Sequence, residues 1–119
     1  MQDIVPGEMR IYEGYYIPHW EVPRFCINTG RRWLGIFPVK ERWMPWMPDG
    51  YTGPWNNVNR RSSSLEDYNS LPVRMYFMKI RGIAGKKGRY GHRGVCHREI
   101  RIHEVLEVRE VPYRSGFNW

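Results

Sequence analysis

Apolar and polar positions alternate over short stretches of this chain, a pattern that indicates β-strands rather than helices. Residues 9–16, MRIYEGYY, are rich in β-forming side chains, and Gly14 predicts a bulge there. Residues 24–28 and 32–39 are two further candidate strands, with a turn predicted at residues 28–30. The N-terminal third of the chain therefore predicts three short strands.

The C-terminal half contains two stronger strand patterns. Residues 73–82, VRMYFMKIRG, are apolar on both faces, which is typical of a strand buried from both sides. In residues 95–111 one face carries the apolar side chains Ile100, Ile102, Leu106 and Val108. Glu104 interrupts this face, so we expect a bulge or bend near residues 104–105.

These two stretches predict a long antiparallel hairpin, the longest strand pair of the fold. A helix over residues 99–110 is the competing prediction, but the many β-branched residues favour a strand. Residues 40–71 contain several prolines and glycines and predict an irregular segment with one short helix near residues 63–68. We therefore predict a single, mainly β domain over residues 1–119, a small antiparallel barrel of the oligonucleotide/oligosaccharide-binding (OB) type with at most one short helix.

Glycine recurs at every third position between residues 82 and 94, in the stretch RGIAGKKGRYGHRG. The spacing matches neither a P-loop nor a dinucleotide-binding fingerprint. Five cations or potential cations fill the gaps, with no acid among them: Lys86, Lys87, Arg89, His92 and Arg93. One interpretation is a hairpin connection whose turn is built by residues 90–92, and the other is an anion-binding loop with exposed amides.

Charge and aromatic content extend this surface. The chain has 19 Lys and Arg against 12 Asp and Glu, a formal charge of +7, which favours acidic partners or is simply a solubility device. Tryptophans alternate with arginines in the middle of the chain, and the candidate binding residues there are Arg42, Trp43, Trp46 and Trp55. Such side chains suit stacked bases, sugars or a protein hot spot; alternatively, the rings pack over the open end of the barrel.

The residues that could support catalysis or metal binding do not form a known motif. His92, Cys96 and His97 offer zinc-ligand atoms, but no CxxC, HxxxH or HExxH spacing is present. Cys26 and Cys96 could form one bridge or remain buried thiols. We therefore expect no enzyme activity, no metal and no cofactor.

Both ends of the chain resemble a family of small uncharacterised bacterial exported proteins and lipoproteins. The resemblance rests on a Gly-x-Tyr-Gly-His-x-Gly signature at residues 88–94, on Arg98-Glu99, and on the β-branched strand ending at Arg109. Near the N-terminus it rests on GYYIPHWEVPRFC, in which Cys26 stands one place early. In the C-terminal signature, Ala84 replaces the serine that is usual in the family. The resemblance implies a location in the bacterial envelope and no established activity.

Two functions follow as hypotheses. The first is a non-enzymatic binding domain of an exported or envelope-associated protein, which binds an anionic polymer or an acidic protein surface. The alternative is a cytoplasmic OB-like module for single-stranded nucleic acid. The chain has no apolar stretch long enough for a membrane span, and its first residues do not resemble a signal peptide, so we expect either a cytoplasmic protein or an exported domain without its leader.

Overall fold

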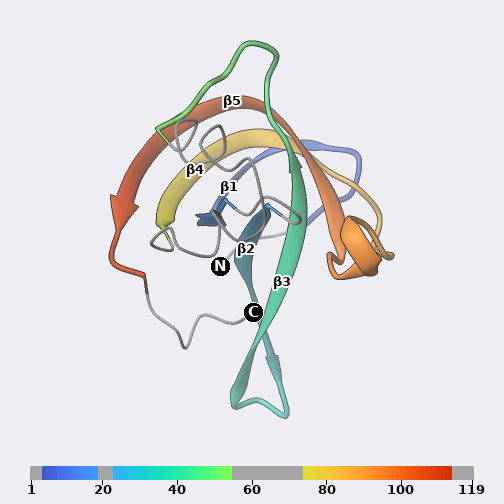
Figure 1. Ribbon diagram of the computed structural model, residues 1–119. Coiled ribbons are helices and arrows are strands. Elements are labelled where there is room, and N and C mark those ends of the chain that lie inside the picture. Colours follow the sequence, from blue (N-terminus) through green and yellow to red (C-terminus); the bar gives the residue numbers. More distant parts are fainter. Residues whose placement is uncertain (1–3, 19–22, 55–73, 114–119) are drawn as a thin grey trace.

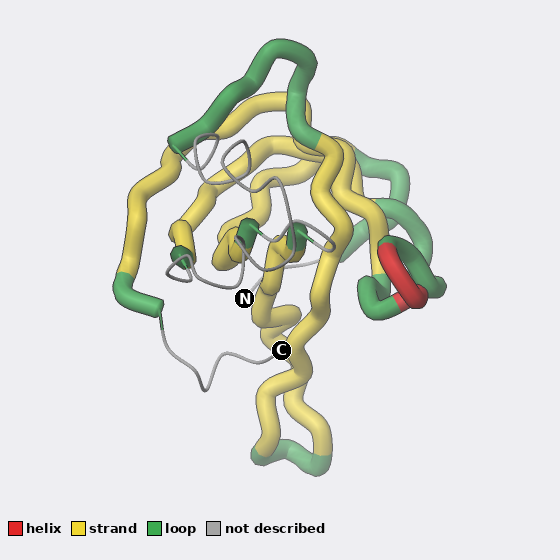
Figure 2. Tube along the Cα trace, viewed as in Figure 1, coloured by secondary structure: helices red, strands yellow, loops and turns green. Residues whose placement is uncertain are grey.

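The computed structural model describes residues 4–18, 23–54 and 74–113, and these residues form a closed five-stranded β-barrel (Figure 1). The strands are β1 (Met9–Ile17), β2 (Arg24–Trp33), β3 (Phe37–Trp46), β4 (Met75–Ala84) and β5 (Arg98–Val111). The single helical element of the described residues is a 3₁₀ turn, η1 (His92–Gly94) (Figure 2). The prediction of a mainly β protein is confirmed.

The strand order around the barrel is β1-β2-β3-β5-β4, and β4 pairs with β1 to close it. All neighbouring strands are antiparallel except β3 and β5, which are parallel. The predicted all-antiparallel pairing is therefore wrong at this one contact. The reason is geometric, because alternating strand directions cannot close a ring of an odd number of strands. A closed, mixed barrel of five strands is consistent with the predicted OB-like type.

The predicted C-terminal hairpin is confirmed, with β4 and β5 paired from Met75↔Val111 to Ala84↔Ile100. The register shifts twice, between Lys79 and Ile80 and between Arg81 and Gly82. The shifts leave one extra β5 residue on each side of residues 104–105, where the sequence predicts a bulge. As a result Val105 packs against the core and Leu106 is 38% exposed, so Leu106 does not share the buried face of Ile100. The competing helix over residues 99–110 is wrong.

Alternate side chains of the strands point into the barrel and form the larger of two apolar clusters. Trp43, Tyr12, Phe25, Met78 and Ile100 are all fully buried there. The other face of β4 is more exposed, since Phe77 and Lys79 are only partly buried and Arg81 is exposed. The prediction that residues 73–82 are buried from both sides is therefore wrong for most of β4, because the outside of a barrel faces solvent.

The prolines of the middle segment led to two further errors. Pro38 and Pro45 lie inside β3, where the sequence predicts the end of one strand and an irregular segment from residue 40. A strand tolerates proline where the ladder does not need its missing N–H. Most of the remaining irregular segment lies outside the described residues. The predicted helix at residues 63–68 lies wholly outside them.

The turn between β2 and β3 lies at residues 34–36, not at the predicted residues 28–30. Residues 28–30 belong to β2, where the register shifts between Asn28 and Arg32. The Thr29 hydroxyl donates a hydrogen bond of 2.8 Å to the Val39 carbonyl across this irregularity. A threonine that looks like a turn residue in the sequence thus stabilises a bulged strand.

Gly14 allows two strands to approach closely and does not form the predicted bulge. The β1–β4 register runs unbroken through Gly14↔Met78. A Cβ atom at Gly14 would lie 2.5 Å from the carbonyl oxygen of Cys26 on β2. Glycine is needed here because any side chain would collide with the neighbouring backbone.

Candidate anion-binding surface

The glycine-rich segment is a hairpin connection between β4 and β5 that starts later than predicted, because β4 continues to Ala84. Three of its glycine amides are used inside the protein. Gly85 donates to the Glu99 carbonyl at 2.8 Å, Gly88 to the His97 carbonyl at 2.8 Å, and Gly94 to the Gly91 carbonyl at 3.1 Å. The predicted cradle of exposed amides is therefore wrong at these positions.

The tip of this connection is a tight, internally bonded turn. Tyr90 and Cys96 exchange backbone hydrogen bonds of 2.9 and 3.0 Å, and the Tyr90 hydroxyl donates to the Lys86 carbonyl at 3.0 Å. Gly91 and the 3₁₀ turn η1 follow directly. Residues 90–92 therefore build the turn, as the sequence predicts.

Gly91 has a backbone conformation that other residues hardly adopt, with φ 76° and ψ −173°. We expect Gly91→Ala to destabilise the protein by about 1–3 kcal/mol, because the methyl group is strained there even though its nearest neighbour, the Cys96 sulfur, is 3.5 Å away. Denaturant unfolding measures the loss. Gly85→Ala, at a glycine of ordinary φ, is the control, and equal stability of the native protein and the Gly91→Ala variant would contradict the account.

The cations of the connection are exposed, as the anion-binding hypothesis requires. The side chains of Lys86, Lys87, Arg89 and Arg93 all lie at the surface. For His92 the structure describes only the backbone. We call the four exposed cations the basic loop; with the amides bonded internally, they act as solvated charges.

The predicted residues of β3 have different positions. Trp43 is fully buried and packs edge-on against Tyr12, with ring centroids 4.9 Å apart. The prediction that Trp43 binds a partner is therefore wrong, because its ring fills the core. Arg42 points outward but is partly buried, and its Nε donates to the Val95 carbonyl at 2.9 Å. Arg42 thus anchors the connection to the barrel, and Trp55 lies outside the described residues.

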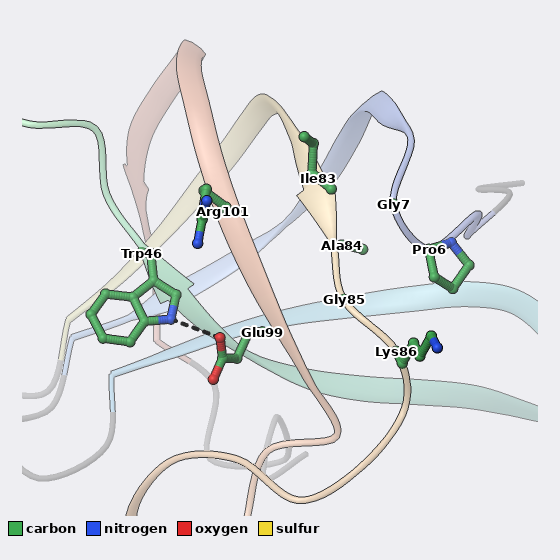
Figure 3. A pocket seen from close by; sticks show the side chains of 9 residues that line it. All are labelled: Pro6, Gly7, Trp46, Ile83, Ala84, Gly85, Lys86, Glu99 and Arg101. Atoms are coloured by element: carbon green, nitrogen blue, oxygen red, sulfur yellow. Dashed lines mark hydrogen bonds between the residues drawn. The ribbon is translucent and has the colours of Figure 1, made fainter.

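Trp46, at the end of β3, remains available to a ligand because it is 51% exposed. Its indole Nε1 donates to the Glu99 carboxylate at 3.2 Å, which fixes the ring beside β5 (Figure 3). A hollow of about 320 Å³ adjoins the ring and is lined by residues that include Pro6, Ile83, Lys86 and Arg101. A second hollow, of about 540 Å³, shares Trp46, Glu99 and Arg101 and continues along Met47 and His103.

The first hollow is thus lined by one tryptophan, two cations and the Glu99 carboxylate. Arg101 pairs with Trp46 in the parallel β3–β5 ladder, and Lys86 connects the first hollow to the basic loop. We call Trp46, Lys86 and Arg101 the Trp46 trough. Sequence analysis missed Arg101, for which the only signal was its outward position on a strand that begins just after the glycine-rich segment.

A buried ion pair beneath this surface was also missed. The Glu41 carboxylate accepts hydrogen bonds from Arg98 Nε at 2.8 Å and from Trp43 Nε1 at 2.9 Å. Arg98 also donates to the Gly85 carbonyl at 3.0 Å. Burial would raise the pKa of Glu41, but these two hydrogen bonds and the positive charges of Arg98 and Lys87 together lower it. Glu41 thus ties the core, β5 and the start of the connection together.

His97 forms a second tie between the connection and β3. Its Nδ1 accepts a hydrogen bond of 3.0 Å from the Arg42 amide, which requires that nitrogen to be unprotonated. Burial and then the Arg42 guanidinium lower the pKa of His97 below the ordinary 6.5, while Glu41 acts in the opposite direction.

Because the unfolded chain binds a proton on His97 more readily, we expect stability to fall as the pH drops below about 6.5, until the lower folded pKa is reached. The melting temperature measured from about pH 7.5 to about pH 5 should show this loss. This loss of melting temperature should be smaller in His97→Gln than in the native protein. In His103→Gln, the control at an exposed histidine, it should equal that of the native protein. Identical profiles for His97→Gln and the native protein would contradict the role of His97.

Neither thiol is set up for chemistry. Cys26 and Cys96 are both buried and unbridged. Burial raises the pKa of Cys26 to about 11 and also raises that of Cys96. Among the described residues, no three His, Cys, Asp or Glu side chains gather as a metal site would require.

Comparisons of the chain with protein-family models, with curated proteins and with solved structures find no match. Within the described ranges, the structure has no helix long and apolar enough to span a bilayer.

Proposed function

We propose that this protein is a non-enzymatic binding module that holds an anionic partner against the basic loop and the Trp46 trough. The observation that carries the proposal is the half-exposed Trp46, which lines one hollow together with Lys86 and Arg101, next to a loop with three more exposed cations. The exposed cations attract negative charge over several ångströms, and the trough supplies a contact of defined shape.

The partner of the first candidate function is an anionic polymer or an acidic protein surface in the bacterial envelope. The resemblance of the glycine-rich signature and of the N-terminal region to exported proteins and lipoproteins supports this location. The excess of cations, a formal +7, supports the choice of an acidic partner.

Single-stranded nucleic acid is the second candidate, and the orientation of Trp46 favours it. The indole N–H bonds Glu99 while half of the side-chain surface remains open to solvent. Bases of any sequence stack on such aromatic surfaces, at about 1–3 kcal/mol per base, while Lys and Arg neutralise the phosphates. Barrels of this type bind oligonucleotides in other proteins.

Trp46→Ala tests the proposal and separates the two candidates. Binding is measured to a short oligothymidylate and to heparin, a polyanion without bases. If a base stacks on Trp46, the variant should bind the oligothymidylate about 5- to 150-fold more weakly, corresponding to one stacked base, and should bind heparin nearly as well as the native protein.

Ile11→Ala is the control, because Ile11 is an equally exposed apolar side chain (50%) on β1. Equal weakening for both polyanions would favour the envelope candidate with Trp46 as a general contact. Native protein that binds neither polyanion would refute the proposed function.

A further inference from the structure

The hairpin between β2 and β3 extends from the barrel as a narrow two-stranded arm (Figures 1 and 2). Its turn is Leu34-Gly35-Ile36, and Leu34 and Ile36 are each 69% exposed. No other large apolar side chain of the described residues is exposed to this degree. The most exposed large apolar side chains of the described structure thus both lie in the turn at the end of this arm.

Folding alone does not explain these residues. Leu34 has a positive φ of 55°, a conformation that Asn, Asp or Gly adopts more readily than Leu. Neither Leu34 nor Ile36 belongs to the barrel core. An apolar residue in a strained and solvated turn costs stability, which points to a role for Leu34 in an interaction.

The charged residues of the arm are all positive. From residue 28 to residue 40, the part of the hairpin beyond the ladder with β1, the sequence has three cations, Arg31, Arg32 and Lys40, and no acid. Trp33 and Phe37 form the last strand pair before the turn. Together these features give an apolar tip, an aromatic pair just behind it and a basic stem, the arrangement typical of segments that lie in the interface of anionic membranes.

We propose that the tip of the β2–β3 hairpin inserts into the headgroup region of an anionic lipid bilayer. Leu34 and Ile36 enter the boundary between headgroups and acyl chains, and the cations of the stem contact the lipid phosphates. This inference does not depend on the proposed binding at the basic loop, since it involves a different hairpin and different residues.

The size of the tip argues for a bilayer over a protein partner or a second copy of the chain. A stable protein interface buries about 800 Å² on each side. Two aliphatic residues on a narrow turn supply only a fraction of that area, whereas a bilayer accepts an inserted point of any width. Nucleic acid is a poor occupant as well, because aliphatic side chains offer bases no aromatic face for stacking.

The test is binding of the whole chain to vesicles of mixed phosphatidylglycerol and phosphatidylcholine, compared with phosphatidylcholine alone. We expect binding to the anionic vesicles only, and at least about tenfold weaker binding when Leu34→Ser and Ile36→Ser are combined. Ile11→Ser, a 50% exposed site on β1, is the matched control and should bind as the native protein does. Equal melting temperatures of the variants show that folding is intact.

A second pair of variants tests the charge. Arg31→Ser with Arg32→Ser should weaken vesicle binding more than Lys86→Ser with Arg89→Ser, which removes the same charge from the basic loop. Brominated acyl chains should quench tryptophan fluorescence in the native protein and much less in the Leu34→Ser, Ile36→Ser variant.

Three outcomes would overturn the inference. The first is native protein that does not bind anionic vesicles, and the second is vesicle binding that the tip substitutions leave unchanged. The third is self-association that depends on concentration and disappears in the tip variant, which would assign Leu34 and Ile36 to contact with a second copy.

Discussion

Replacing Glu41 by alanine should destabilise the protein by about 3–5 kcal/mol, since it removes one partner of a buried ion pair. The side chains of Arg98 and Glu41 are only 11% and 7% exposed, and Nε and Oε1 are 2.8 Å apart. The substitution leaves the Arg98 guanidinium with the Gly85 carbonyl as its remaining described partner, and it deprives the buried Trp43 Nε1 of its acceptor. Each loss has a desolvation cost that no new contact offsets.

Denaturant unfolding measures this effect, and Glu104→Ala is the matched control. Glu104 also forms an ion pair, with Arg81 at 3.3 Å, but both side chains are nearly half exposed. That pair should contribute only about 0–1 kcal/mol. Glu41→Gln keeps an acceptor oxygen and should fall between the two. A Glu41→Ala protein as stable as Glu104→Ala would show that the buried pair does not stabilise the fold.

Replacing all four cations of the basic loop by serine should weaken binding to single-stranded oligonucleotides by roughly two orders of magnitude or more at about 0.1 M salt. The change lowers the formal charge from +7 to +3 and touches no buried side chain; the substituted residues are Lys86, Lys87, Arg89 and Arg93. If each cation neutralises one phosphate, the slope of log K against log salt should become shallower by up to about 2.8.

A second variant separates the effect of the net charge on binding from the effect of the charges in the basic loop. It also carries a formal +3, but the serines replace cations on the outer face of β4 and β5 or beside it: Arg74, Lys79, Arg81 and Arg109. Its binding should fall less than that of the loop variant. Both proteins should unfold near the native temperature, since exposed charges contribute little to stability. Equal binding by the two variants would mean that the basic loop is only a connector.

Sequence patterns predicted the strands well where buried and exposed side chains alternate between the inside and the outside of the barrel. The β4–β5 hairpin and the irregularity near residues 104–105 follow from the apolar pattern of β5 and its interruption by Glu104. Between residues 28 and 46, proline and threonine predict breaks that the strands do not have, because their local turn preference is weaker than the pairing of β2 with β3. The parallel β3–β5 contact follows only from barrel closure, which no local pattern encodes.

The candidate site was predictable in part. The exposure of the basic loop follows from its charge and its glycines, but the use of its amides does not, because their acceptors lie on residues 91, 97 and 99 and depend on the hairpin register. Trp43 and Trp46 look alike in the sequence and have opposite positions in the structure. Side chains of a strand alternate between its two faces, so residues an odd number of positions apart lie on opposite faces. Trp43 and Trp46 are three positions apart, so their opposite placement follows once both are known to lie in β3.

The most direct test of the central claim is a map of the contact surface by two-dimensional NMR of the ¹⁵N-labelled protein, titrated with a short oligothymidylate and, separately, with heparin. The account predicts shifts for the backbone amides of residues 86–93 with either polyanion, and a shift of the Trp46 indole N–H with at least one of them. The buried Trp43 indole should stay in place and serves as an internal control. Shifts confined to other parts of the barrel, or no shifts with either polyanion, would contradict the account.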